Sequence, residues 1–366
     1  MKRVLVSLAA LILAALFTAT AHAGIKIAVA GPMTGPDAAF GDQFKTGAEL
    51  AVVDINAAGG LLGQQLELKV YDDACDPKQA MTVANRLVGD GAVLAVGHFC
   101  SHTSIPASKV YEEEGIIQIS PGSTNPKLTD EGGPNVFRVC GRDDQQGSVA
   151  GAYLAENFGD KNIAILHDHS TYGKGLAQET TKALNGGGKK EAFHDTFSKD
   201  GTDFSALVSK LRHNKIDVVY VGGYYDGAAR LARQMRDQGV DAILVGGDTL
   251  VTKEFAAIAG KAGEGTLMTF SPDPRKNPAA AEIVERLRAK GVEPEGYVLY
   301  AYAAVQAWKQ AVEKAGSVDP AKVMQALHSS QFDTVIGTFE FDENGDPNLR
   351  PYAFYRWQDG SYAQID

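Results

Sequence analysis

The alternation of short apolar runs with longer amphipathic stretches constrains the fold of this 366-residue chain more than any other feature. Apolar runs occupy residues 25–31, 66–71 and 92–97, and each is followed by a stretch with helical periodicity. Strands separated by helices of this length predict βαβ units with parallel sheets. Because the same rhythm begins again near residue 145, the chain is predicted to form two α/β lobes.

The other predicted elements follow the same pattern. In the first set, helices are expected at residues 40–58, 77–88 and 104–114, with a further strand at 116–120. In the second set, strands at 163–167, 191–197, 218–222 and 243–247 alternate with helices at 145–157, 172–184, 203–212 and 227–238. Three helices follow at 279–290, 296–314 and 320–327, before a β-rich end from 335 to 362. The pattern leaves open which lobe this tail joins.

The first residues have the layout of a secretory signal peptide. Lys2 and Arg3 precede an uncharged apolar run at residues 4–17, and Ala21-His22-Ala23 offers a small-x-small cleavage site. The apolar run is shorter than the roughly 20 residues that a membrane-spanning helix needs, which disfavours the alternative of an uncleaved anchor. We therefore expect export to the periplasm, cleavage after Ala23 and a mature chain that begins at Gly24.

Composition and charge indicate which kinds of molecule this chain is not expected to bind. With 44% hydrophobic and 22% charged residues, the chain is typical of a globular protein, and it is long enough for two domains. Its net charge is −10, and it contains no run of Lys and Arg. Nucleic acid and anionic lipid are therefore not expected as partners.

Three cysteines, Cys75, Cys100 and Cys140, predict one disulfide and one free thiol in an exported protein, and the count alone leaves the pairing open. His98 and His102 flank Cys100, but a zinc site there would lack a fourth local ligand, so no metal is expected.

Motifs for enzymatic chemistry are not convincing. The sequence has no Walker A motif, no GxGxxG after a strand and no GxSxG elbow, so neither an enzyme nor a cofactor is expected. His167-Asp168-His169 follows a predicted strand and is interpreted as a loop. The acidic segment 342–346 resembles the start of a calcium loop, but its glycine is misplaced, and a turn is the better interpretation.

Several segments together resemble the leucine/isoleucine/valine-binding proteins of bacterial ABC importers. The longest is residues 71–80 (YDDACDPKQA), and others are 40–43 (FGDQ), 54–56 (DIN), 97–101 (GHFCS) and 222–224 (GGY). The resemblance extends from about residue 25 to 357. It implies an α/β fold of the type I periplasmic binding protein class, with two lobes joined by three crossovers. Lobe one would combine residues 24–142 and 271–350, and lobe two would combine 143–270 and 351–366.

The resemblance also implies a binding site for a free amino acid between the closing lobes. Ser101 and Thr124 would hold the α-carboxylate, and the Gly122 carbonyl, the Thr124 hydroxyl and Asp248 would meet the ammonium. The residues agree with this interpretation, because Ser101 lies in a turn that opens a helix and Asp248 follows a strand. Taken singly, each could instead be a capping or turn residue.

Aromatic side chains complete the implied pocket: Phe40, Phe99, Tyr172, Tyr224 and Tyr297. Cys75–Cys100 would be the disulfide, and Cys140 would be free and buried. The chain departs from the family at four positions, with Asp248 for Glu, Phe99 for Leu, Tyr297 for Phe and Phe40 for Tyr. We therefore expect a shift toward small amino acids such as alanine, valine, threonine or proline, or toward γ-aminobutyrate.

The implied partners are an inner-membrane permease and its cytoplasmic ATPase subunits, with the binding protein a monomer. The alternative function is a periplasmic sensor that delivers its closed form to a chemoreceptor or kinase. A hydrolase of the same lobed shape is a third hypothesis, and it would turn its ligand over.

Overall fold

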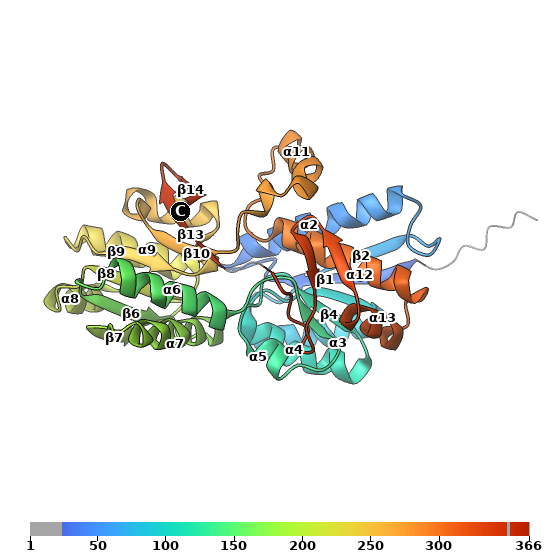
Figure 1. Cartoon of the computed structure of the whole chain (residues 1–366), viewed down its shortest axis with the longest axis horizontal. Helices are drawn as coiled ribbons and strands as arrows, with labels where there is room; N and C mark the ends of the chain where they lie inside the picture. Colours follow the sequence, from blue (N-terminus) through green and yellow to red (C-terminus); the bar gives the residue numbers. More distant parts are fainter. Residues whose placement is uncertain (1–23, 350–351, 366) are drawn as a thin grey trace, which may run out of the picture.

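The computed structural model describes residues 24–349 and 352–365, and it has two lobes, each built around one sheet (Figure 1). The first sheet is entirely parallel, with strand order β2-β1-β3-β4-β5. Its strands are β1 (Ile25–Gly31), β2 (Leu66–Asp72), β3 (Leu94–Gly97), β4 (Ile117–Ser120) and β5 (Val136–Arg138). We call this sheet and the helices packed on it the first lobe.

The side chains of β1 explain how helices cover both faces of this sheet. Ile25, Ile27 and Val29 point into a core that includes residues of α2 (Ala38–Ala57) and α12 (Val298–Ala315). Ala28 and Ala30 point the other way, toward α3 (Pro77–Gly89) and α4 (Ser101–Glu114). The alternation of a strand therefore sorts large residues to one helical layer and small ones to the other.

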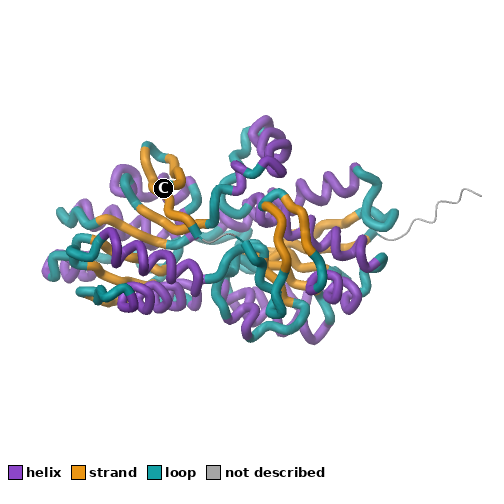
Figure 2. Tube along the Cα trace, viewed as in Figure 1, coloured by secondary structure: helices purple, strands orange, loops and turns teal. Residues whose placement is uncertain are grey.

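The second lobe contains a seven-stranded sheet with the order β14-β13-β10-β9-β8-β6-β7. Its strands are β6 (Ile163–His167), β7 (Phe193–Thr196), β8 (Val218–Gly222), β9 (Ile243–Gly246), β10 (Leu267–Phe270), β13 (Ala353–Gln358) and β14 (Ser361–Gln364). β13 runs antiparallel to β10, so the tail of the chain completes this second sheet. The tube view shows helices on both sides of the sheets, with the C-terminal hairpin of β13 and β14 at the edge of the second lobe (Figure 2).

The helices of the second lobe pack closely on one another. They are α6 (Asp143–Asn157), α7 (Thr171–Gly186), α8 (Ser205–His213), α9 (Tyr225–Asp237) and α10 (Lys253–Ala259). A Cβ on Gly151 of α6 would lie 2.4 Å from the Thr180 carbonyl oxygen of α7, so glycine is what lets these two helices touch. None of the helices that the structure describes is long and apolar enough to cross a membrane.

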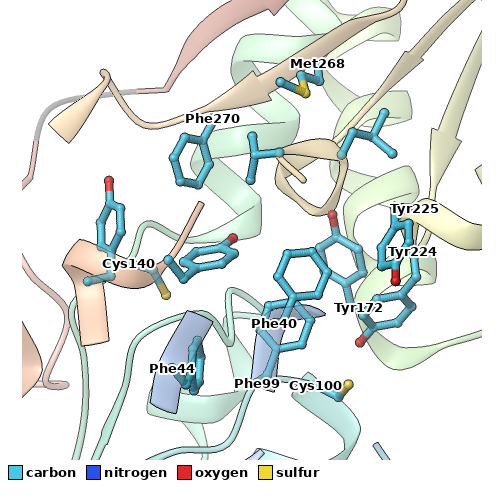
Figure 3. Close-up of a cluster of buried hydrophobic side chains, with 14 of the residues drawn as sticks. Phe40, Phe44, Phe99, Cys100, Cys140, Tyr172, Tyr224, Tyr225, Met268 and Phe270 are labelled. Carbon is cyan, nitrogen blue, oxygen red and sulfur yellow. The ribbon is translucent and has the colours of Figure 1, made fainter. Parts of the chain in front are cut away.

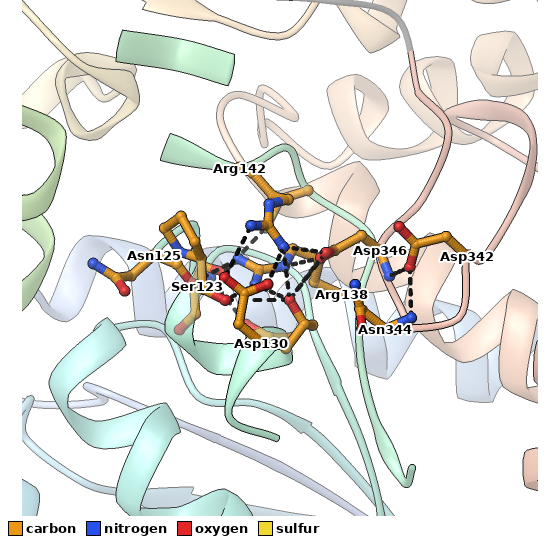
Figure 4. A network of polar contacts seen from close by, with 12 residues as sticks. Ser123, Asn125, Asp130, Arg138, Arg142, Asp342, Asn344 and Asp346 are labelled. Atoms are coloured by element: carbon orange, nitrogen blue, oxygen red, sulfur yellow. Dashed lines mark hydrogen bonds and ion pairs between the residues drawn. The ribbon is translucent and has the colours of Figure 1, made fainter. Parts of the chain in front are cut away.

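Three connections carry the chain between the lobes: after β5, after β10, and between β12 (Gly337–Glu340) and β13. The first passes a network of charged side chains in which Arg138 and Asp346 are buried and Asp130 and Asp144 are partly exposed (Figure 4). The Arg138 Nε lies 2.6 Å from Asp346. The Arg142 guanidinium contacts Asp130 at 2.9 Å and Asp144 at 3.0 Å. Asp346 precedes the third connection, so this network links the first connection to the third.

Most predicted elements are confirmed, with some changes at their ends. β1, β6 and β8 have the expected bounds, whereas α4 begins three residues before the expected start, at Ser101. The helix α11 (Ala281–Ala289) lies within the predicted helix at 279–290. The sequence did not predict the strands β5 and β10 or the short helices α5 (Lys127–Asp130) and α10. Of the hairpin formed by β11 (Gln331–Thr334) and β12, it predicted only the part after residue 335. The expected signal peptide lies outside the described residues.

The disulfide joins Cys75 and Cys100, with a Cα–Cα distance of 5.7 Å, and Cys140 is free and buried. This confirms the pairing that the resemblance implied. The bond ties the loop after β2 to the residue before α4, and the His102 Nε2 lies 2.8 Å from the Cys75 carbonyl oxygen. The His102 ring lies close to the sulfur atoms of Cys75 and Cys100, as metal ligands would, but these two sulfurs are bonded to each other in the disulfide.

We expect the double variant Cys75→Ser with Cys100→Ser to lose about 3 kcal/mol of unfolding free energy, because the disulfide closes a loop with a sequence separation of 25. Urea denaturation monitored by circular dichroism measures this loss. Cys140→Ser is the control, since it leaves the disulfide in place, and it should cost less. Equal denaturation midpoints for the double variant and the unaltered protein would contradict the expectation.

Candidate ligand-binding site

The predicted residues of the first lobe lie at the carboxyl ends of neighbouring parallel strands. Phe99 and Ser101 follow β3, and Ser101 is the first residue of α4. Gly122 and Thr124 lie in the loop after β4. Because β3 and β4 pair in register, these two loops meet at one edge of the sheet, where open α/β sheets bind ligands.

Hydrogen bonds hold these loops in place. The Ser120 hydroxyl donates to the His98 carbonyl oxygen at 2.7 Å, and the Ser123 hydroxyl donates to the Phe99 carbonyl oxygen at 2.7 Å. A Cβ on Gly122 would lie 2.9 Å from the Phe99 ring, so the loop packs against that ring only with glycine at this position.

His98 has a structural position that the sequence did not indicate. Its imidazole is fully buried, 2.6 Å from an Asp73 carboxylate oxygen on one side and 2.9 Å from the Tyr111 hydroxyl on the other. Asp73 follows β2 and Tyr111 lies in α4, so this chain of hydrogen bonds fastens the loop after β3 to both neighbouring segments.

The second lobe contributes Asp248, which follows β9 and is only 1% exposed. Its carboxylate accepts hydrogen bonds from the Gln146 amide at 3.0 Å and the Tyr172 hydroxyl at 2.8 Å, and also from the Tyr297 hydroxyl. These donors are all neutral. Burial raises the pKa of Asp248 to about 6, while the Tyr297 and Tyr172 hydrogen bonds oppose that rise. A buried carboxylate held only by neutral donors favours the approach of a cation.

Aromatic rings from both lobes lie together in one buried cluster (Figure 3). Phe40 of α2 stacks on Phe99 with ring centroids 4.1 Å apart, and Phe99 lies 5.6 Å from Tyr297 and 6.2 Å from Tyr224. Tyr172 lies 5.3 Å from Tyr224. The structure thus brings all five predicted aromatic side chains into one buried group.

Direct contacts show that the lobes are closed on each other. The Asn125 amide donates to the Thr171 carbonyl oxygen at 3.1 Å, and the Tyr225 hydroxyl donates to the Pro36 carbonyl oxygen at 2.5 Å. Lys199 of the second lobe lies 3.3 Å from Asp37, at the start of α2. Sequence reasoning missed this ion pair because neither residue belongs to a motif and 161 positions separate them along the chain.

The segment His167-Asp168-His169 leads into a loop and the acidic segment 342–346 forms a turn, as expected. The Asp168 carboxylate accepts hydrogen bonds from the Ser170 amide at 3.0 Å and the Tyr224 amide at 3.1 Å. It therefore also positions an aromatic residue of the site. Asp342 accepts hydrogen bonds from the Asn344 and Asp346 amides at 2.9 Å each, which closes a tight turn.

Comparison with known proteins agrees with this geometry. A family model described as periplasmic binding protein matches residues 24–361. The Leu/Ile/Val-binding protein homolog 1 of Brucella suis is 47% identical over 369 residues, covering 100% of both chains. An amino acid binding protein of Pseudomonas aeruginosa is 49% identical over 349 residues, which cover 94% of this chain and 93% of that protein.

Solved structures match as well. The leucine binding protein of Thermotoga maritima superposes with a TM-score of 0.87 at 29% identity, covering 93% of this chain and 98% of that one. A branched-chain amino acid transporter substrate binding protein of Streptococcus pneumoniae, in complex with isoleucine, gives a TM-score of 0.85 at 27% identity, covering 94% and 100% of the two chains.

We expect Asp248→Asn to stabilise the ligand-free protein at pH 7.5, by up to about 3 kcal/mol when the cleft is closed. A carboxyl whose pKa is raised in the folded protein stabilises it at low pH, and that contribution is lost as the pH rises through about 6. The gain should therefore disappear by pH 4. Denaturant unfolding at both pH values measures it, with Asp195→Asn, a partly exposed aspartate paired with Lys210, as the control in the same lobe. A gain that is the same at both pH values would contradict this assignment.

Proposed function

Because the chain belongs to the periplasmic binding protein family, we propose that it is the substrate-binding component of an ABC importer for a zwitterionic aliphatic amino acid. It is a binding protein and not an enzyme. The observation that carries the proposal is Asp248, a buried carboxylate with neutral donors only, in the same closed cleft as the start of α4. The Asp248 carboxylate is suited to an ammonium group, and the start of α4 is suited to a carboxylate.

The ligand's carboxylate would lie at Ser101, where the first backbone N–H groups of α4 and the serine hydroxyl can donate to it. Thr124 would add a second hydroxyl. The ammonium would lie against Asp248 and the Gly122 carbonyl. The burial of these two residues supports the assignment. Ser101 and Thr124 are only 2% and 1% exposed, although their loops lie at the edge of the first sheet that faces the other lobe.

Closure would couple binding to transport. The contacts between the lobes, such as Lys199 with Asp37, exist only when the two surfaces meet. A ligand that touches both lobes stabilises this closed state, which an inner-membrane permease with its ATPase subunits can distinguish from the open one. We assign residues 24–142 and 271–350 to the first lobe and 143–270 and 351–366 to the second, with the protein acting as a periplasmic monomer after cleavage at Ala23.

A thermal-shift panel of the natural amino acids and γ-aminobutyrate tests the function. A ligand at 100 times its dissociation constant should add about 2.7 kcal/mol of stability. Asp248→Ala should lose about 30- to 4,000-fold in affinity while remaining folded, because it removes one partner of a buried charge pair. Asp195→Ala, in an exposed pair with Lys210, is the matched control and should bind normally. No shift with any compound, or turnover of a compound, would overturn the proposal.

Two large side chains underlie our proposal on specificity. The rings of Phe99 and Tyr297 lie 5.6 Å apart beside Asp248, and both residues are buried. They would leave little room for a leucine side chain, so alanine, valine, threonine, proline or γ-aminobutyrate should compete with leucine or bind better.

The double variant Phe99→Leu with Tyr297→Phe should strengthen leucine binding relative to alanine by about 5- to 150-fold, because it removes overpacking. Calorimetry on both ligands measures the ratio, which cancels the general effect of losing the Tyr297 hydroxyl. If the unaltered protein already binds leucine tenfold better than alanine, valine and proline, the small-pocket interpretation is wrong.

A further inference from the structure

A second buried carboxyl lies beside the site. Asp143 is the first residue of α6, directly after the first connection between the lobes, and it is fully buried. Its backbone N–H donates to the Thr124 carbonyl oxygen at 2.9 Å. Among the residues that the structure describes, neither oxygen of its carboxyl group makes a well-formed hydrogen bond, and the Thr124 hydroxyl is the one side-chain hydrogen-bond donor near enough to lower its pKa. Since buried polar groups are nearly always bonded, this carboxyl needs an explanation.

Asp143 faces the same buried region as Asp248. It lies three residues before Gln146, on the same face of α6. Gln146 binds Asp248 twice: its amide donates to the carboxylate at 3.0 Å, and its oxygen accepts from the Asp248 amide at 3.2 Å. The start of α6 thus places the Asp143 carboxyl beside the cleft, and its Gln146 side chain binds the Asp248 carboxylate.

No cation near Asp143 in the described part of the chain is free to form an ion pair with it. Arg138 of β5 is the nearby cation, and it is engaged by Asp346 and by the Ser123 and Asn125 carbonyl oxygens (Figure 4). Asp144 is paired with Arg142. The other titratable groups around Asp143 come from the neighbouring segments of both lobes, and each is an acid, a hydroxyl or a thiol. They are Cys140, Tyr172, Tyr220, Tyr224, Asp248, Tyr297 and Tyr352.

We propose that Asp143 is a positioning residue that enters the closed, liganded cleft as a neutral carboxylic acid, so that closure over the ligand takes up one proton. The inference rests on the proposed function, because it assumes a zwitterion in the cleft. One ammonium can neutralise one carboxylate, and the ligand's own carboxylate adds a negative charge. A second ionised carboxyl would therefore be buried without compensation, which is costly.

Electrostatics support the same assignment. Burial and the charge of Asp248 raise the pKa of Asp143, while the Thr124 hydroxyl and Arg138 oppose that rise. When the lobes separate, water reaches the space between Thr124 and Asp248, and the Asp143 carboxyl can ionise. The closed form then binds one proton more than the open form, and affinity increases as the pH falls.

Isothermal titration calorimetry at pH 7.5 tests the inference, with L-alanine as the probe and L-leucine as a second probe. Titrations in phosphate and in Tris, which differ in ionisation enthalpy, give the number of protons exchanged. The unaltered protein should take up about one proton and lose about tenfold in affinity for each pH unit between 6.5 and 8.5. Asp143→Asn, which imitates the neutral acid, should bind with no proton uptake and a flat pH profile.

Asp144→Asn is the matched control, because it changes the neighbouring acid, which is paired with Arg142, and it should keep the uptake. Binding without proton uptake in the unaltered protein, or uptake that persists in Asp143→Asn, overturns the inference alone. Absence of binding heat with both probes and of any thermal shift overturns the proposed function as well.

Discussion

The burial of Asp248 between the two lobes is the constraint on which the rest of the site depends. Its carboxylate is held by Gln146, Tyr172 and Tyr297, which solvate the charge without neutralising it. Closure therefore removes an ionised group from water, and only a cation placed within reach can offset that cost. A molecule without a positively charged group would leave this carboxylate unpaired, so charge limits what the cleft can enclose before shape does.

The two lobes contribute to this discrimination in different ways. In the first lobe, hydrogen bonds of His98 and of the Ser120 and Ser123 hydroxyls hold the loops after β3 and β4, which contain Ser101 and Thr124. In the second lobe, the Asp248 carboxylate accepts a hydrogen bond from the Tyr297 hydroxyl of the first lobe. Donors that are already held in place lower the entropic cost of binding.

The sequence predicted those parts of the fold that have a local signal. The strands β1, β6 and β8 are continuous apolar runs, whereas β5 and β10 have only three and four residues and give no period. Ser101 and Asp248 could be proposed from the family resemblance, and the position of each after a predicted strand agreed with it. Asp143, Gln146, Asp37 and Lys199 could not be proposed, because their roles come from contacts between distant segments. The pairing of Cys75 with Cys100 required the family resemblance.

The order of the strands in the second sheet has a consequence for the synthesis of the protein. β13 and β14 join that sheet only at the end of the chain, and the Trp357 indole donates to the Leu250 carbonyl oxygen at 3.1 Å. Across the cleft, α12 must emerge before one face of the first sheet is covered. Neither lobe can therefore bury its full core until these later elements of the described chain have been synthesised, which delays core formation in both lobes.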